Sequence, residues 1–137
     1  RDELLDFLVA VVVGPRLGRG RLACLHHYPA SQASLARLDA ADPRTALRFE
    51  LYSEGVELAN GFVELGDAEE QRRRFEADNA RRAVRGQPVR PLDEWLLQAL
   101  PALPPCAGVA VGFDRVLMLA AGAARIEEVQ SHPFERA

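Results

Sequence analysis

Residues 46–65 read ALRFELYSEGVELANGFVEL, and this stretch decides the fold. Apolar and polar side chains alternate from Leu47 to Tyr52, a period of two that is typical of a strand with one buried face. Glu54-Gly55 is a turn signal, and a second strand-like run continues from Val56 to Leu65. We therefore predict a β-hairpin with strands 46–53 and 56–65, joined by a two-residue turn.

Helical and strand patterns lie on both sides of the hairpin. Apolar spacing, prolines, glycines and capping residues predict a helix over 2–13, a strand over 21–28, a helical turn from Ser31 to Arg37, helices over 67–85 and 92–100, a strand over 108–112 and a buried helix from Phe113 onward. The run Val11-Val12-Val13 also fits a strand. Because the strands include a hairpin and the helices are grouped, we predict an α+β fold, an antiparallel sheet flanked by helices.

The composition limits the possible chemistry. The chain has 137 residues and a formal net charge of −3, so no overall basic field attracts it to nucleic acid. Its 17 Lys and Arg residues are all Arg, which excludes a Schiff base or phosphate loop that uses a lysine of this chain. Cys24 and Cys106 lack metal-site spacing, so we expect a reducing, cytoplasmic setting. No apolar run is long enough to predict a membrane span.

Two glutamates of the predicted hairpin form a candidate metal site. With a turn at 54–55, position 52 pairs with 57 and position 50 with 59, so Glu50, Tyr52 and Glu57 share one face. The two glutamates then lie on a diagonal, about 7 Å apart at the backbone. Mg²⁺ prefers oxygen ligands and would relieve the repulsion between two such carboxylates. A solvated polar face of the hairpin is the alternative that this pattern leaves open.

The second strand carries three further candidate residues, Asn60, Phe62 and Glu64. Strict alternation places them on the opposite face from Glu57. A single pocket that uses all of these side chains therefore requires a bulge or a strong local twist near residues 59–61, where Gly61 would tolerate one. The alternative is a core position for Phe62 and an exposed position for Glu64.

A second chemical pattern occupies residues 108–119, which read GVAVGFDRVLML. A strand with glycine at Gly108 and Gly112 allows a ligand to lie close against the backbone. Arg115 then opens a helix whose other positions are mostly apolar, so its guanidinium needs a partner. Such a group can stack on a planar ring and hold phosphate oxygens. A structural ion pair between Arg115 and a carboxylate is the open alternative.

Together these segments resemble the lysine branch of the class II aminoacyl-tRNA synthetases. Residues 108–119 are similar to class II motif 3, whose arginine corresponds to Arg115. Residues 48–65 are similar to the block that holds the metal-binding and lysine-binding residues of that branch. Residues 28–37 and 57–62 look more like the elongation factor P lysine ligases, and residues 132–137 resemble the C terminus of that family. Val63 departs from the pattern, which often has His there.

For the nucleotide, the resemblance implies ATP as co-substrate and Mg²⁺ as cofactor. Glu50 and Glu57 would bind Mg²⁺ against the ATP phosphates, and Gly112 would contribute to ATP binding. Arg115 would stack on the adenine and reach the γ-phosphate. Arg115 and Glu57 are accordingly the residues to which the resemblance gives a catalytic role.

For the second substrate, the resemblance implies lysine or (R)-β-lysine. Glu64 would pair with an ammonium group, Asn60 would hydrogen-bond near the reacting end, and Phe62 would line the aliphatic stem. The acceptor would be a lysine side chain of elongation factor P. The family also implies a homodimer for the full-length enzyme.

The resemblance implies that residues 1–137 are the C-terminal part of a class II catalytic domain, with motif 3 present and motifs 1 and 2 absent. Because the family takes an α-phosphate-binding arginine from motif 2, we expect this chain alone to be inactive. Two alternatives stay open. One is a catalytic fragment of a true lysyl-tRNA synthetase, with tRNA as the acceptor. The other is a truncated paralogue that binds a ligand or partner without catalysis.

Overall fold

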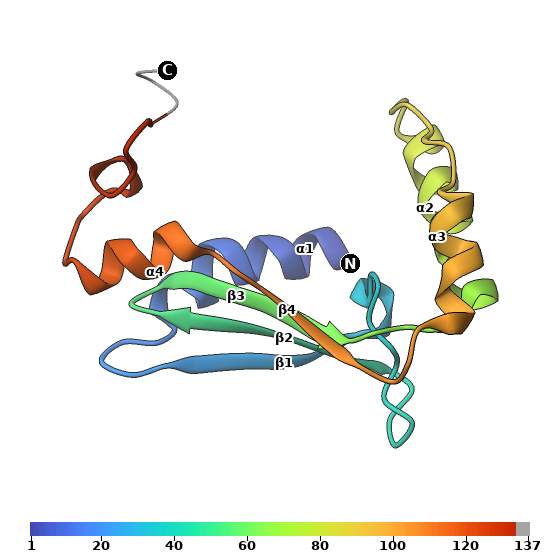
Figure 1. Ribbon diagram of the computed structural model, residues 1–137, viewed down its shortest axis with the longest axis horizontal. Helices are drawn as coiled ribbons and strands as arrows, with labels where there is room; N and C mark the ends of the chain where they lie inside the picture. Colours follow the sequence, from blue (N-terminus) through green and yellow to red (C-terminus); the bar gives the residue numbers. More distant parts are fainter. Residues whose placement is uncertain (134–137) are drawn as a thin grey trace. The chain divides into compact units, whose positions relative to one another are not determined.

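Four strands form an antiparallel sheet in the computed structural model, which describes residues 1–133 (Figure 1). β1 (Ala23–Pro29), β2 (Thr45–Ser53), β3 (Val56–Val63) and β4 (Ala107–Val111) are hydrogen-bonded in the order β1-β2-β3-β4. The predicted α+β fold, an antiparallel sheet with flanking helices, is therefore confirmed.

The chain packs as two compact units, and each strand contributes residues to both. The first unit consists of Arg1–His27, Phe49–Gly61 and the residues from Val109 onward. The second unit consists of Tyr28–Arg48 and Phe62–Gly108. The candidate residues of the hairpin are thus divided between the units after Gly61.

β2 and β3 form the predicted hairpin. Glu54 and Gly55, the two residues between these strands, both have positive φ, at 49° and 78°. Positive φ at both positions is the turn geometry that matches the twist of a two-residue hairpin. The backbone N–H of Glu54 donates to the carbonyl oxygen of Gly18 (2.9 Å), and that of Gly55 donates to Leu17 (2.8 Å). The tip of the hairpin is therefore attached to the N-terminal segment of its own unit.

The first unit begins with a continuous helical segment. α1 (Asp2–Phe7) continues as a π-helix over Leu8–Val13 and ends in a 3₁₀ turn over Gly14–Arg16. The valine run that also fitted a strand is therefore helical. After β4 come α4 (Phe113–Ala120) and a 3₁₀ turn over Ile126–Glu128.

Both helices of the second unit begin at aspartate caps. Asp67 caps α2 (Ala68–Val84) and Asp93 caps α3 (Glu94–Ala99). Each aspartate accepts a hydrogen bond from the backbone N–H three residues further on, at 2.9 and 3.0 Å respectively. These caps satisfy N–H groups that the first turn of a helix leaves unpaired. A 3₁₀ turn over Leu100–Ala102 continues from α3.

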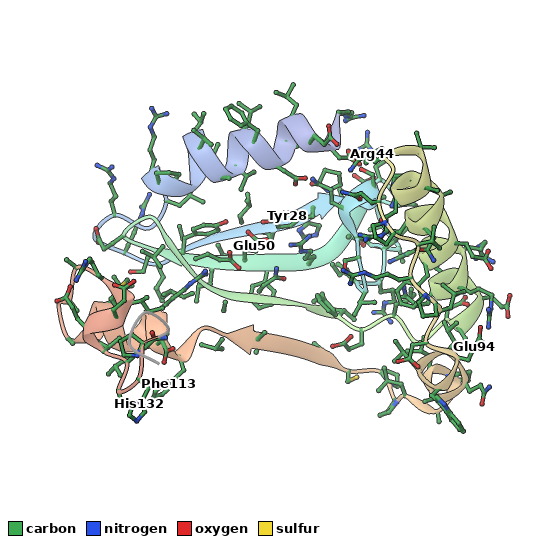
Figure 2. All side chains as sticks on the ribbon, turned by 90° about the horizontal axis from the view of Figure 1, so that it is seen from above. Tyr28, Arg44, Glu50, Glu94, Phe113 and His132 are labelled. Atoms are coloured by element: carbon green, nitrogen blue, oxygen red, sulfur yellow. The ribbon has the colours of Figure 1, made fainter. Side chains whose placement is uncertain are left out.

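Ion pairs organise the surface of these two helices. Arg72 of α2 and Glu94 of α3 (Figure 2) form a bidentate pair with N–O distances of 2.9 and 2.6 Å. Within α2, Glu70 accepts hydrogen bonds from Arg73 and Arg74 at 2.8 and 2.9 Å. These two guanidinium groups hold the pKa of the Glu70 carboxyl below its usual value.

A small apolar core lies in the second unit. Ala33, Ala36 and Ala46 are buried, and Leu38 and Phe62 pack against them. Small side chains at these positions let the backbone segments approach closely, so the core is built around alanine with two larger residues at its margin.

The segment after β1 differs from the prediction. The expected helical turn from Ser31 to Arg37 is wrong, because only Ala30–Gln32 forms a 3₁₀ turn and its N-cap is Pro29. The chain then pairs with the residues around the end of β3: Ala36 forms an antiparallel bridge with Glu64, and the N–H of Arg37 donates to a β3 carbonyl oxygen at 2.9 Å. This pairing uses backbone groups that a helix would need, so it overrides the local capping signal.

α4 is also less enclosed than predicted. No residue of α4 is buried. Phe113 (Figure 2) is 74% exposed, and Val116 and Leu117 are partly exposed. The expectation of a buried helix is therefore wrong for the described residues, although Met118 and Leu119 are half-buried. Among the helices of residues 1–133, none is both long and apolar enough to cross a membrane. Of the C-terminal segment 132–137, which resembles a family C terminus, residues 134–137 lie outside the described part.

Candidate functional site

Glu50, the first glutamate of the candidate metal pair, is buried within the hairpin (Figure 2). It is only 8% exposed. The hydroxyl of Tyr52 donates to Oε2 at 2.7 Å, and Nδ2 of Asn60 makes a long hydrogen bond of 3.4 Å to Oε1. Both carboxylate oxygens therefore accept a bond from the hairpin itself, which fixes the orientation of the group.

Asn60 shares the face of Glu50, and strict alternation does not predict this. If position 50 lies opposite 59, the side chain at 60 points to the other face of the sheet. The contact between Asn60 and Glu50 contradicts that simple pattern. Leu58 and Ala59 are both buried, so burial does not alternate just before Asn60. The bulge or strong twist that a shared pocket requires near residues 59–61 stays a prediction.

The contact with Glu50 fixes the orientation of the Asn60 side-chain amide. A carboxylate can only accept, so the NH₂ group of Asn60 must face Glu50 and its Oδ1 must face away. This Oδ1 is buried and has no hydrogen-bond partner among residues 1–133. A buried carbonyl oxygen without a partner is costly. The site therefore offers an acceptor suited to an N–H or ammonium group.

Arg115 of α4 contacts Glu57 of β3. Its Nη1 donates to the backbone oxygen of Glu57 at 2.8 Å and lies 3.8 Å from Oε2 of the same residue. The two side chains are 48% and 37% exposed, so the ion pair is open to solvent. Asp114, the sequence neighbour, instead accepts a hydrogen bond from Gln130 at 2.8 Å. A guanidinium has five N–H donors, and within residues 1–133 most of those on Arg115 are left for other acceptors.

Gly112 connects β4 to α4 and leaves space for Arg115. Its N–H donates to the carbonyl oxygen of Leu58 at 2.8 Å, which joins the end of β4 to β3. A Cβ at this position would lie 3.2 Å from Cδ of Arg115. Glycine therefore lets the arginine side chain fold back beside the strand. In the first unit the structure thus brings Glu57, Gly112 and Arg115 together.

Phe62 and Glu64 belong to the second unit. Phe62 packs against the alanine core, as the structural alternative predicted. Glu64 is half-buried, and its N–H donates to the carbonyl oxygen of Cys106 at 3.0 Å. An exposed Glu64, the other part of that alternative, is therefore wrong. The described geometry holds Glu64 by its backbone and leaves its carboxylate beside β4.

The residues fit Mg²⁺ only as an ion bound together with a substrate. Among residues 1–133 no group of three or more His, Cys, Asp or Glu side chains could hold a metal ion. Glu50 and Glu57 would supply two carboxylates. Mg²⁺ commonly takes one or two carboxylates and completes its octahedron with water and phosphate oxygens. The shared face of the two glutamates stays a prediction.

Comparison with known proteins decides the family. The sequence model of the class II tRNA synthetases for D, K and N matches residues 18–136. The chain belongs to this class II tRNA synthetase family. The match includes the whole hairpin and the strand–helix segment with Arg115, so both chemical patterns lie within the shared region.

Individual relatives of this class II chain are similar over its whole length. It is 52% identical to the elongation factor P–(R)-beta-lysine ligase of Salmonella arizonae and 54% identical to that of Klebsiella pneumoniae subsp. pneumoniae. The protein of the same name from Pectobacterium carotovorum subsp. carotovorum is 52% identical. Each alignment covers 100% of this chain and 42% of the relative. The chain thus spans less than half the length of these relatives.

The structure also adds two residues to the candidate site that the sequence did not assign. Tyr52 was placed on the face of Glu50, but its hydrogen bond to the carboxylate follows only from the structure. Gly108 was expected to let a ligand approach β4. In the structure the group beside it is the Glu64 carboxylate, because a Cβ at Gly108 would lie 2.5 Å from Oε1. A glycine within a strand was the sequence signal for this close approach.

Proposed function

We propose that this chain is part of a ligase that activates lysine or (R)-β-lysine with ATP and transfers it to a lysine of elongation factor P. The observation that carries the proposal is the identity of 52–54% to proteins named elongation factor P–(R)-beta-lysine ligase, over the whole chain. We further propose that residues 1–137 are the C-terminal part of the catalytic domain, with the motif 3 segment at 108–119.

The proposed reaction has two steps. A carboxylate oxygen of the amino acid attacks the α-phosphorus of ATP, and pyrophosphate leaves as the acyl-adenylate forms. The amine of the acceptor lysine then attacks the acyl carbon, loses a proton, and AMP leaves. The protein supplies no covalent intermediate in either step, so positioning and charge neutralisation carry the catalysis.

The first unit would bind the nucleotide. Mg²⁺, when bound, would neutralise phosphate charge as pyrophosphate departs. Glu50, fixed by Tyr52, and Glu57 would hold it. Arg115, half-exposed and with N–H donors to spare, would stack on the adenine and reach the γ-phosphate. Gly112 supports this role because it leaves the arginine room beside the strand.

Three residues would bind the amino acid. The Oδ1 of Asn60, which has no hydrogen-bond partner in the described part of the chain, would accept a hydrogen bond from an ammonium near the reacting end. The carboxylate of Glu64 would pair with an ammonium, and Phe62, which is only partly buried, would line the aliphatic stem. A charge-assisted hydrogen bond of this kind is worth about 1.5–3 kcal/mol.

The test is ATP–pyrophosphate exchange by the full-length protein, with (R)-β-lysine and α-lysine compared. We expect exchange with both, and a higher kcat/KM with (R)-β-lysine. Purified elongation factor P should then gain the mass of one acyl group on a lysine. Exchange without this gain, together with acylation of tRNA, would instead favour a lysyl-tRNA synthetase.

The proposal also includes the oligomeric state and the cellular location of the enzyme. We propose a homodimer for the full-length enzyme, as the class II resemblance implies, and light scattering of the purified protein tests it. Because the proposed acceptor is a translation factor, we propose that the reaction takes place in the cytoplasm.

A further inference from the structure

Gly108 of β4 lies directly beside the carboxylate of Glu64. An ideal Cβ built on Gly108 would be 2.5 Å from Oε1 and 3.7 Å from Cδ of Glu64. The first distance is far below a van der Waals contact, so any side chain at position 108 would displace this carboxylate oxygen. The backbone at Gly108 is therefore part of the surface against which Glu64 rests.

The backbone of Glu64 has little freedom to adjust. On one side its N–H donates to the carbonyl oxygen of Cys106 at 3.0 Å. On the other side Glu64 forms an antiparallel bridge with Ala36, and the N–H of Leu65 donates to Leu35 at 3.1 Å. With the main chain paired on both sides, the position of the carboxylate depends on the side-chain rotamer and on what lies beneath it.

We propose that Gly108 is a positioning residue that sets where the Glu64 carboxylate meets the substrate ammonium. This inference rests on the proposed function, which gives Glu64 the ammonium. The absence of a side chain at 108 lets the carboxylate lie against the strand backbone. A methyl group there pushes Oε1 away and rotates the carboxylate out of its pairing geometry.

The overlap between a Cβ at position 108 and the Glu64 carboxylate predicts weaker binding of the amino acid without loss of folding. The atom that a Cβ would meet is the far end of a flexible side chain, and not backbone. The Glu64 side chain can swing aside, so Gly108→Ala folds normally. The loss appears in the recognition of the amino acid, because only the carboxylate has moved.

The experiment measures ATP–pyrophosphate exchange by the full-length Gly108→Ala protein with (R)-β-lysine. We expect the KM for the amino acid to rise about tenfold, as for a lost charge-assisted hydrogen bond, and the KM for ATP to change less than about twofold. The matched control is Gly66→Ala, whose Cβ would meet only ordinary contacts at 3.7 and 3.8 Å. The control should behave as the unmodified protein does.

A double substitution separates positioning from general damage. Glu64→Asp shortens the side chain by one methylene, so its carboxylate no longer reaches the added methyl group. In this background Gly108→Ala should change the amino-acid KM by less than about twofold, and the two effects should not add. Equal effects in both backgrounds, or equal increases in the KM for ATP and amino acid, would overturn the positioning role.

The outcomes also separate this inference from the proposed function. If the unmodified protein shows neither exchange nor a rise in Tm with (R)-β-lysine or lysine, the proposed function fails, and the role of Gly108 fails with it. If the unmodified protein shows exchange and Gly108→Ala matches it in both KM values, only the inference about Gly108 is wrong.

Discussion

The hydroxyl of Tyr52 donates a 2.7 Å hydrogen bond to Oε2 of Glu50, two residues earlier on the same strand. Both residues are buried, at 6% and 8% exposure. Residues i and i+2 share a face of a strand, so the tyrosine orients one carboxylate oxygen from the same strand, while Asn60 of β3 contacts the other. The carboxylate that we propose to bind Mg²⁺ and ATP is therefore oriented before its ligand arrives.

Removing the Tyr52 hydroxyl should weaken the binding of Mg²⁺ and ATP. In the full-length protein we expect Tyr52→Phe to raise the Mg²⁺ concentration needed for half-maximal exchange by about tenfold, since a hydrogen bond to a charged group is worth about 1.5–3 kcal/mol. The KM for the amino acid should stay near its original value. Tyr28→Phe, at the other tyrosine of the chain, is the matched control. An unchanged Mg²⁺ requirement in Tyr52→Phe would count against the orienting role.

Replacing Arg115 by lysine keeps the charge and removes the planar fork. We expect Arg115→Lys to raise the KM for ATP by about tenfold or more, because lysine can neither stack on the adenine nor form paired bonds to phosphate. Arg125→Lys, at an exposed arginine of the same unit, should have little effect. The measurement is exchange as a function of ATP. If both variants behave alike, Arg115 has only the structural bond to Glu57.

Glu64→Gln should damage amino-acid use far more than ATP use. The amide keeps the shape but loses the charge, so we expect the KM for (R)-β-lysine to rise about tenfold to a hundredfold. Glu50→Gln provides the reciprocal comparison, because its loss should fall on ATP and Mg²⁺. Exchange kinetics with each substrate varied in turn give both values. Equal losses for the two substrates in Glu64→Gln would contradict its assignment.

The ion pairs of α2 predict a pH-dependent contribution to stability. The pKa of Glu70 is lowered by Arg73 and Arg74, so its ionised form stabilises the fold above the unfolded pKa, and this is lost as pH falls through the lowered pKa. Glu70→Gln should cost about 0.5–1 kcal/mol at neutral pH, a small value because solvent screens the pair. Urea unfolding at neutral and at strongly acidic pH measures this. The difference from the unmodified protein should vanish in acid, and exposed Glu69→Gln should show little difference at either pH.

Residues 1–137 expressed alone should not catalyse exchange. The α-phosphate needs a positive partner, which the family takes from motif 2. Arg115 is assigned to the other end of ATP, and the chain has no lysine to replace the missing arginine. Pyrophosphate exchange is the measurement, with the full-length protein as the positive control. Clear activity of the isolated chain would show that another of its arginines binds the α-phosphate.

The hairpin was predictable because its signals are local. Alternation along residues 46–53 and a Glu-Gly pair specify two strands and a two-residue turn, and the positive φ of Glu54 and Gly55 confirms it. The contact between the side chains of Asn60 and Glu50 was not predictable in the same way. Which side chains meet there depends on how the sheet is covered around the buried Leu58 and Ala59, and a single strand sequence carries no such information.

Two other predictions failed because packing partners decide them. The segment after β1 has a helix-capping signal at Ser31, yet Ala36 pairs with Glu64 from a distant part of the sequence. The apolar face of α4 predicted burial, but burial also needs a covering segment, and the described residues provide none for Phe113. Local patterns predict an element only where no distant segment competes for the same backbone groups. They do not identify the element against which each one packs.

The hydrogen bonds from the hairpin tip to Leu17 and Gly18 should slow the local opening of the tip. Hairpin tips usually open early, so their amide hydrogens exchange with water much faster than those of the strands. Here the N–H groups of Glu54 and Gly55 are both hydrogen-bonded to the N-terminal segment, at 2.9 and 2.8 Å. Their exchange should therefore be as slow as that of the strand interior. We therefore also expect the separation of Glu50 and Glu57, which lie a few residues from the tip on either strand, to vary little over time.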